Sequence, residues 1–196
     1  MTSTENSFID FISNGHDITN DVCKAIESKI LIKKVKKKEL LQRKGDTNLK
    51  AYYVKSGLLK SYTIDENGKE HIFMFAPEKW IISDINSLAI PGGSDLFVQA
   101  IENTEVEVIS PEIFQLISDD KNNSHLKEVN KLHRRNAVLQ KRIISLMSQT
   151  AIERYNDFIK TYPGIVQRVP QKMIASYLGI TPQALSKSIS QASAKR

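Results

Sequence analysis

The hydrophobic pattern of the chain changes character near residue 110. Between residues 31 and 110, short runs rich in Val, Ile, Tyr and Phe alternate with turn residues, which is typical of β-strands. So many short strands predict a closed or sandwiched β unit. A helix over residues 17–30 is expected to precede it, with Thr19 as its N-cap. The expected strands are 31–36, 39–42, 51–56, 58–64, 70–76, 80–82, 96–101 and 105–109.

The dipeptide Asn67-Gly68 predicts a tight hairpin within this β unit. Both residues tolerate a positive φ, which the two central residues of a type I′ turn must adopt. We therefore expect residues 58–64 and 70–76 to pair as antiparallel neighbours through a type I′ turn.

After Pro111 the hydrophobic period becomes helical, and residues 124–148 form the longest predicted helix. Shorter helices are expected over residues 112–118 and 150–162, and Thr150 and Glu153 have the spacing of a capping box at the start of the latter. Alternating steps of three and four place six residues on one seam, namely Val129, Leu132, Asn136, Leu139, Ile143 and Leu146. This spacing is typical of a two-stranded coiled coil, in which paired asparagines at a buried position favour a parallel register. The seam predicts a homodimer, and the alternative is a helix buried in a monomeric core.

Residues 170–192 have the pattern of a helix-turn-helix. The first helix must stop at Gly179, and Thr181-Pro182 then supplies an N-cap and first-turn signal for a second helix. Ala175 is small where the second helix would cross closely, and Leu185 is placed to be buried. In such a motif the second helix enters the DNA major groove.

Several positions of this motif are candidates for DNA contact. Gln183 can pair with adenine and Lys187 with guanine, whereas residues at the helix starts can hold phosphates. The full set is Gln171, Lys172, Thr181, Pro182, Gln183, Ser186 and Lys187. The alternative is a helical hairpin that only packs against another domain.

Charge favours a nucleic-acid partner for the C-terminal part. Residues 1–120 have a net charge of −5, whereas residues 121–196 have 14 Lys and Arg against 3 Asp and Glu, a net charge of +11. This asymmetry predicts that the second part meets a polyanion, and double-stranded DNA is the partner we expect. Charge alone leaves a solvated basic helical face as the alternative.

Other classes of protein are excluded by patterns that the sequence lacks. It has no run of eighteen apolar residues for a membrane span and no secretory signal pattern, so we expect no membrane partner. The single cysteine, Cys23, cannot form an internal disulfide, which predicts a cytoplasmic location. The four histidines lack metal-ligand spacing, and catalytic motifs are absent, so we expect neither a metal site nor an enzyme.

Three stretches of the sequence, in their order along the chain, resemble the Crp/Fnr superfamily of bacterial transcription regulators. Their residues are most similar to those of members from Bacteroidetes. The three stretches are YYVKSGLLKSY, DENGKEHIFMFAPEKWIISD and AIERYNDFIKTYPGIVQRVPQKMIASYLGITPQALSK. The resemblance implies an α+β protein with a cyclic-nucleotide-binding-like β roll (a double-stranded β-helix) and flanking helices over residues 1–121. It further implies a dimerisation helix over 122–148 and a helix-turn-helix domain over 149–196, for which we expect no full β wing.

The implied role is a homodimer that binds a two-fold DNA site, with RNA polymerase and an unidentified small-molecule effector as further partners. By this resemblance Thr181 contacts phosphate, while Pro182, Gln183 and Lys187 read bases. Trp80, Ser83 and Asp84 are candidates for the effector pocket, and their alternative role is that of turn and cap residues. The alternative function is a small-molecule-binding or protein-interaction β-roll module whose C-terminal hairpin is only structural.

One departure from the family pattern concerns the effector. Cyclic-nucleotide-binding members of the family hold the ribose and phosphate of the nucleotide with a Gly-Glu pair and, several residues later, an Arg-Ser or Arg-Thr pair. Aligned through FVQAIENTEVEVIS, the second pair falls on Ser94-Asp95, and no Gly-Glu pair precedes it. The missing arginine loses a charge-assisted hydrogen bond, and the Asp95 carboxylate would repel a phosphate. We therefore expect no binding of cAMP or cGMP and no cofactor.

Overall fold

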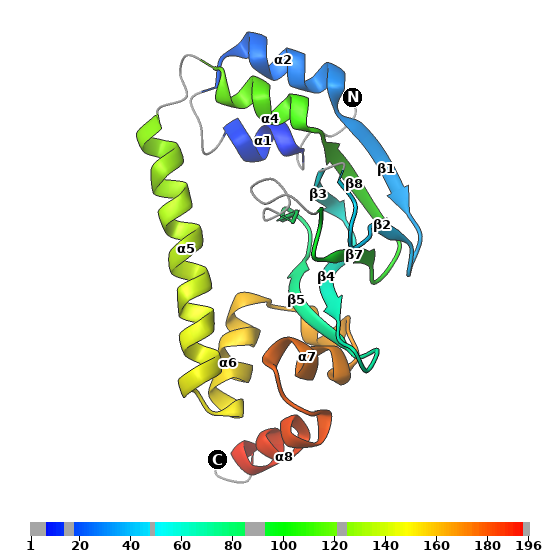
Figure 1. Ribbon diagram of the computed structural model, residues 1–196, viewed down its shortest axis with the longest axis vertical. Helices are drawn as coiled ribbons and strands as arrows, with labels where there is room; N and C mark the ends of the chain where they lie inside the picture. Colours follow the sequence, from blue (N-terminus) through cyan, green and yellow to red (C-terminus); the bar gives the residue numbers. More distant parts are fainter. Residues whose placement is uncertain (1–6, 14–17, 48–49, 85–92, 121–124, 194–196) are drawn as a thin grey trace. The chain divides into compact units, whose positions relative to one another are not determined.

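The chain divides into two compact units (Figure 1). The computed structural model describes residues 7–13, 18–47, 50–84, 93–120 and 125–193, with side chains except those of 125–132, 134, 135 and 193. The first unit comprises residues 1–63 and 73–128, and the second comprises residues 64–72 and 129–196. A short piece of the β region therefore belongs with the C-terminal helices.

The β region forms two four-stranded antiparallel sheets in the described part of the chain, with the orders β1-β8-β3-β6 and β2-β7-β4-β5. The strands are β1 (Leu31–Val35), β2 (Leu40–Gln42), β3 (Ala51–Ser56), β4 (Leu59–Ile64), β5 (Glu70–Ala76), β6 (Ile81–Ile82), β7 (Phe97–Ala100) and β8 (Thr104–Ile109). Each expected strand is present, with its ends displaced by one residue or less. The α+β class predicted from the sequence is confirmed.

Alternation along β3 shows how the core is organised. Successive residues of a strand point to opposite faces of the sheet. Tyr52 and Val54 therefore face the core between the sheets, where they pack with Leu59 and Val98 of the second sheet. All four side chains are buried. The other face of β3 is covered by helices, so this strand is apolar on both sides.

The covering helices are α1 (Phe8–Ser13), α2 (Asn20–Lys29) and α4 (Pro111–Ser118). They pack against Ala51 and Tyr53 of β3 in a second buried cluster. The sequence predicts α2 and α4 but not α1, because six residues are too few to display a helical period. The backbone N–H of Phe8 donates to the buried Glu107 carboxylate at 2.6 Å, which fixes the start of α1 on β8.

The hairpin at Asn67-Gly68 is confirmed, but its turn is not type I′. Gly68 has a φ of 76°, whereas Asn67 lacks the positive φ that type I′ requires. The carboxylate of Asp65 accepts the N–H groups of Asn67 (2.9 Å) and Lys69 (3.0 Å). These bonds favour a three-residue loop that ends in a left-handed glycine, which is another common hairpin connection.

The remaining helices form most of the second unit. They are α5 (His125–Ser148), which begins in the first unit, α6 (Ala151–Thr161), the 3₁₀ turn η1 (Ile165–Gln167), α7 (Gln171–Leu178) and α8 (Pro182–Ser193). The sequence predicts these four α-helices. Thr150 and Glu153 form a reciprocal capping box at the start of α6, as their spacing predicts.

Candidate nucleic-acid interface

Gly179 makes the turn between α7 and α8, as the sequence predicts. Its φ of 69° and ψ of 32° lie in the left-handed region that favours glycine. The N–H groups of Gly179 and Ile180 donate to carbonyls near the end of α7, those of Ser176 (3.2 Å) and Ala175 (3.0 Å). A Cβ on Gly179 would also lie 3.3 Å from Cδ2 of Leu146. Both backbone conformation and space therefore favour glycine here.

Helix α8 begins at a side-chain cap and has one buried face. Thr181 Oγ1 accepts the N–H of Ala184 at 3.1 Å, and Pro182 occupies the first helical position. Leu185 is fully buried, as is Ala175 on α7. These contacts fix the inner face of α8, so that its opposite face is available for a ligand.

The predicted DNA-contacting residues are all exposed. They are Gln171, Lys172, Thr181, Pro182, Gln183, Ser186 and Lys187. Gln183, Ser186 and Lys187 are spaced by three and four residues on α8, so they share one face of the helix. Gln171 and Lys172 lie at the start of α7, where N–H groups without intrahelical partners favour an anion.

Two arginines that the sequence analysis did not assign fix the end of α7. Arg142 on α5 donates to the carbonyl of Tyr177 (2.9 Å), and its guanidinium lies 3.9 Å from the centroid of the Tyr177 ring. Arg154 on α6 donates to the carbonyl of Leu178 at 2.6 Å. The last carbonyls of a helix lack intrahelical partners, and cations are favourable there. The partners are 35 and 24 residues apart, so no local pattern indicates these bonds.

Ser176 on α7 attaches the hairpin of residues 64–72 to the helix-turn-helix. Its Oγ accepts the N–H of Ile72 (3.0 Å) and donates to the carbonyl of Glu70 (2.7 Å). Both groups belong to β5, which is the edge strand of its sheet. Edge strands present backbone groups that lack a neighbouring strand. One hydroxyl thus takes the place of part of that strand, and no sequence signal marks it.

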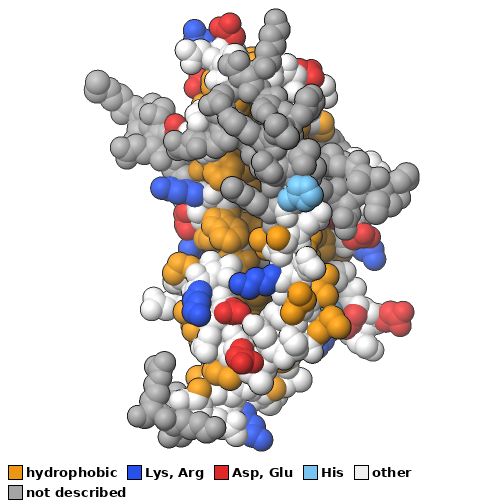
Figure 2. Space-filling model, turned by 90° about the vertical axis from the view of Figure 1, so that its left-hand side faces the viewer, with side chains coloured by type: hydrophobic (Ala, Val, Ile, Leu, Met, Phe, Trp, Pro, Cys, Tyr) orange, Lys and Arg blue, Asp and Glu red, His pale blue; other side chains and the backbone are white. Residues whose placement is uncertain are grey.

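The described part of α5 exposes apolar side chains. In the predicted seam Asn136 is exposed, and Leu139, Ile143 and Leu146 are 44%, 57% and 44% exposed. The side chains of Val129 and Leu132 lie outside the described residues. Figure 2 shows hydrophobic side chains (orange) exposed between charged ones on one face of the molecule. The dimer seam and its alternative, a helix buried in a monomeric core, both stay predictions.

The three candidates for an effector pocket have different surroundings. Trp80 packs partly against the core between the sheets, and its carbonyl accepts the N–H of Val54 at 2.9 Å. Ser83 is half-buried, whereas Asp84 is buried and accepts backbone N–H groups at 95 and 96. For Asp84 these bonds fit the alternative role of a turn or cap residue. Asp95 is exposed, so the buried carboxylate at this turn is that of Asp84.

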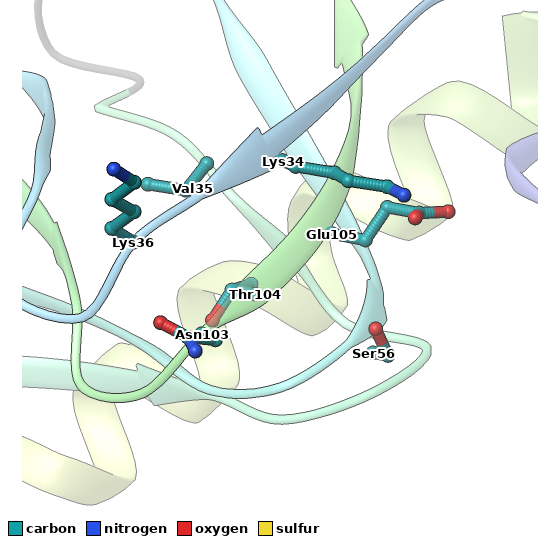
Figure 3. Close-up of a pocket in the computed structure, with 7 residues that line it drawn as sticks. All are labelled: Lys34, Val35, Lys36, Ser56, Asn103, Thr104 and Glu105. Atoms are coloured by element: carbon teal, nitrogen blue, oxygen red, sulfur yellow. The ribbon is translucent and has the colours of Figure 1, made fainter.

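A pocket of about 370 Å³ lies elsewhere on the β region, near β1, β3 and β8 (Figure 3). Its lining residues are Lys34, Val35, Lys36, Ser56, Asn103, Thr104 and Glu105. Two polar side chains of this lining already accept hydrogen bonds from backbone N–H groups of the protein. Asn103 Oδ1 accepts the N–H of Lys37 at 3.0 Å, and Thr104 Oγ1 accepts that of Leu58 at 3.2 Å. No sequence pattern indicates this pocket.

Metal sites and membrane spans are both absent from the described part of the chain. Among these residues no group of three His, Cys, Asp or Glu side chains is placed to hold a metal ion. Of the helices that the structure describes, none is long and apolar enough to cross a membrane.

Solved structures with the same fold include transcription regulators. FixK2 from Bradyrhizobium japonicum superimposes with a TM-score of 0.67 at 19% identity, over 85% of each chain. The c-di-GMP-responsive global regulator CLP from Xanthomonas campestris gives 0.68 at 14% identity, over 90% of this chain and 93% of CLP. A protein described as a candidate Crp/Fnr-family regulator from Eubacterium rectale gives 0.64 at 17% identity, over 91% and 85%. No family model and no curated protein sequence matches the chain.

These comparisons establish the fold of the chain. The chain shares its fold with these structures, one of which is described as a candidate Crp/Fnr-family regulator, and this is the fold that the resemblance in the sequence implies. Identities of 14% to 19% do not transfer a ligand or a DNA sequence to individual residues. The origin in Bacteroidetes stays a prediction.

Proposed function

We propose that the chain is a DNA-binding transcriptional regulator of the Crp/Fnr type that works as a homodimer in the cytoplasm and has no catalytic role. The observation that carries this proposal is the helix-turn-helix. Its inner face is fixed by buried apolar contacts, while Gln183, Ser186 and Lys187 are exposed together on α8. The net charge of +11 over residues 121–196 supports a polyanionic partner.

In this proposal α8 lies in the DNA major groove. Gln183 and Lys187 face base edges, where Gln can pair with adenine and Lys can donate to guanine. Thr181 and the start of α7, at Gln171 and Lys172, hold phosphates. Phosphate contacts fix the position of the protein, whereas the contacts of α8 to the bases select the sequence.

The apolar face of α5 supports the homodimer. Large exposed apolar faces mark interaction surfaces, and the heptad spacing of Leu139, Ile143 and Leu146 matches a second copy of the same helix. Two copies would present two α8 helices to half-sites one turn of DNA apart, about 34 Å. The expected operator is therefore a two-fold symmetric sequence.

The proposal includes no response to cAMP or cGMP. Ser94 stands where a phosphate-binding arginine would be needed, and the buried carboxylate of Asp84 lies against the same turn. The negative charge of the Asp84 carboxylate would repel the phosphate of a nucleotide bound at this turn. RNA polymerase and an unidentified effector remain proposed partners.

DNA binding is tested by selecting genomic fragments with the purified protein and measuring affinity for the recovered duplex by fluorescence anisotropy. Lys187→Ala is expected to weaken binding to that duplex by about 1–3 kcal/mol, because it removes a contact to a base edge. Lys24→Ala is the matched control. It removes the same charge from an exposed position on α2, and we expect its affinity to stay within about twofold of wild type.

Salt dependence separates DNA binding from the alternative function. Neutralised phosphates release counterions, so the logarithm of affinity should fall steeply with the logarithm of salt concentration. Unchanged affinity in Lys187→Ala would show that α8 does not read bases through this residue. Failure to retain any duplex would favour a β-roll binding module whose C-terminal hairpin is only structural.

A further inference from the structure

Three paired residues form a polar row across the sheet at the pocket near β1, β3 and β8, which we call the Lys34 pocket (Figure 3). Lys34 of β1 pairs with Glu105 of β8, and Glu105 pairs with Ser56 of β3. Directly paired residues of neighbouring strands point to the same face of a sheet, and Figure 3 shows the side chains of Lys34 and Glu105 extending toward each other. A cation, a carboxylate and a hydroxyl therefore lie side by side in the pocket wall.

An irregularity in β3 directs Ser56 toward this pocket. Val54 is buried in the core between the sheets, and strict alternation would direct Ser56, two residues later, to the same core. The register of β3 against β8 shifts between Val54 and Ser56, and a bulge of this kind inserts one extra residue. Ser56 is therefore exposed beside Glu105 and not buried. Bulges are over-represented next to functional sites, where they redirect a side chain.

Several donors of the Lys34 pocket are not used by the fold. In the described part of the chain, Lys34 Nζ and Ser56 Oγ have no hydrogen-bond or ion-pair partner. Asn103 accepts the N–H of Lys37 through Oδ1 (3.0 Å), whereas its Nδ2 has no partner among the same residues. An ammonium, a hydroxyl and an amide thus line a hollow of about 370 Å³, a volume typical of small-molecule sites.

The charges of the lining favour an anion. Lys34 and Lys36 contribute two positive charges, and Glu105 contributes one negative charge. The Glu105 carboxylate also lies 3.9 Å from Lys55 Nζ, which offsets its charge further. An ionised carboxylate only accepts hydrogen bonds, so Glu105 selects a ligand that brings its own donors. Hydroxyl groups are such donors, and a bare anion has none.

We propose that the Lys34 pocket binds a small organic anion that carries hydroxyl groups. Lys34 pairs with the anionic group, a carboxylate or a phosphate ester, while Ser56 and the Asn103 amide donate to its oxygens. Glu105 accepts the hydroxyl groups of the ligand. The pocket shares no lining residue with the turn at Ser94-Asp95. The inference goes beyond the proposed function, because it assigns a ligand site on the first unit and does not depend on DNA binding.

The test compares hydroxylated anions with their parent ions by nuclear magnetic resonance of the full chain. Glycerate is compared with acetate, glycerol 3-phosphate is compared with inorganic phosphate, and glycerol supplies hydroxyl groups without charge. We expect saturable shifts of the amide signals of Ser56, Asn103 and Glu105 with at least one hydroxylated anion. Its parent ion and glycerol should each bind at least about tenfold more weakly at constant ionic strength. Binding by only one of the two hydroxylated anions identifies the anionic group.

Two variants separate recognition of the charge from recognition of the hydroxyl groups. Lys34→Gln should weaken binding of the hydroxylated anion at least about fivefold, because an ion pair is lost. Lys24→Gln, which removes an exposed lysine of α2, should leave the affinity within about twofold of wild type. Glu105→Ala should abolish the preference for the hydroxylated anion over its parent ion. The loss of negative charge affects both ions alike, so the ratio of their affinities isolates the hydroxyl contacts.

Three results would overturn the proposal. Parent ions that bind as tightly as the hydroxylated ions would reduce the pocket to a patch of lysine charge. Unchanged amide signals with every probe would exclude the site, and a preference that survives in Glu105→Ala would exclude the assigned contacts. If Glu105→Ala does not fold, Ser56→Ala replaces it, because Ser56 is exposed in the same row. A preference unchanged in Ser56→Ala would then overturn the proposal.

Discussion

Single polar side chains complete several helix ends in this chain. Thr19, Thr150 and Thr181 each accept a backbone N–H at a helix start, and Arg142 and Arg154 serve carbonyls at a helix end. These backbone groups have no partner within the helix. The sequence predicts the threonine caps, because a cap and the helix it begins are adjacent in the chain. It does not predict the arginine contacts, because these join residues 35 and 24 positions apart.

The capping box of α6 predicts a dependence of stability on acid pH. The pKa of Glu153 is lowered from 4.5 because its carboxylate accepts two hydrogen bonds from Thr150. The larger effect comes from the backbone N–H and the smaller one from the hydroxyl. A folded-state pKa below the unfolded value means that this contribution is fully present above pH 4.5 and is lost as pH falls through the lowered pKa.

Glu153→Gln should therefore be less stable than wild type at neutral pH, and the difference should shrink toward pH ~3. Urea unfolding of both proteins across this range measures the effect. A difference that stays constant with pH would show that the Glu153 charge does not contribute to stability.

At the scale of elements, local patterns predicted the described strands and all described α-helices but α1, whereas contacts between elements had to come from the structure. The alternation of strand residues located all eight strands, because it is visible within a few residues. The type of the Asn67-Gly68 turn was wrong because the Asp65 carboxylate decides it. In the candidate site, helical spacing predicted the exposed face of α8 but not the partners of Arg142 and Ser176.

The link from α5 to α7 gives the first prediction at this scale. Arg142→Ala removes a charge-assisted hydrogen bond and a cation–π contact to Tyr177. We expect a loss of about 1–3 kcal/mol in the free energy of unfolding and faster amide exchange in α7. Lys141→Ala, an exposed neighbour with the same charge, is the control. Equal effects of the two substitutions would remove the special role assigned to Arg142.

The apolar face of α5 gives the second prediction at the scale of elements. Leu139→Glu should dissociate the proposed dimer, because the seam would then bury two unpaired carboxylates facing each other. Ala137→Glu places the same charge at an exposed position two residues away, off the seam, and should leave the dimer intact. Sedimentation equilibrium distinguishes these outcomes. A wild-type monomer at micromolar concentration would refute the dimer itself.

At the scale of the whole molecule, the chain passes between its two units three times. It leaves the first unit after residue 63, returns at residue 73 and leaves again after residue 128 within α5. The resemblance in the sequence implied domain boundaries after residues 121 and 148, and these stay predictions. The contact of Ser176 with β5 accounts for the inclusion of residues 64–72 in the second unit.

Removing this contact should loosen α7. Ser176→Ala deprives the N–H of Ile72 and the carbonyl of Glu70 of their partner, and we expect faster amide exchange in α7 and at the hairpin tip. Ser190→Ala is the control, because Ser190 is an exposed serine on α8 whose hydroxyl bonds only within its own helix. Identical exchange in both variants would show that the hairpin does not support α7.

The interleaving of the two units has a consequence for how such a chain can be recombined. A graft of residues 129–196 onto a foreign domain leaves behind the hairpin of residues 64–72, whose β5 backbone groups bond to Ser176 of α7. A functional chimaera must transplant both segments at once, so gene fusion at a single crossover point would yield an incomplete module. The two halves of this protein are therefore expected to be inherited and to diversify together.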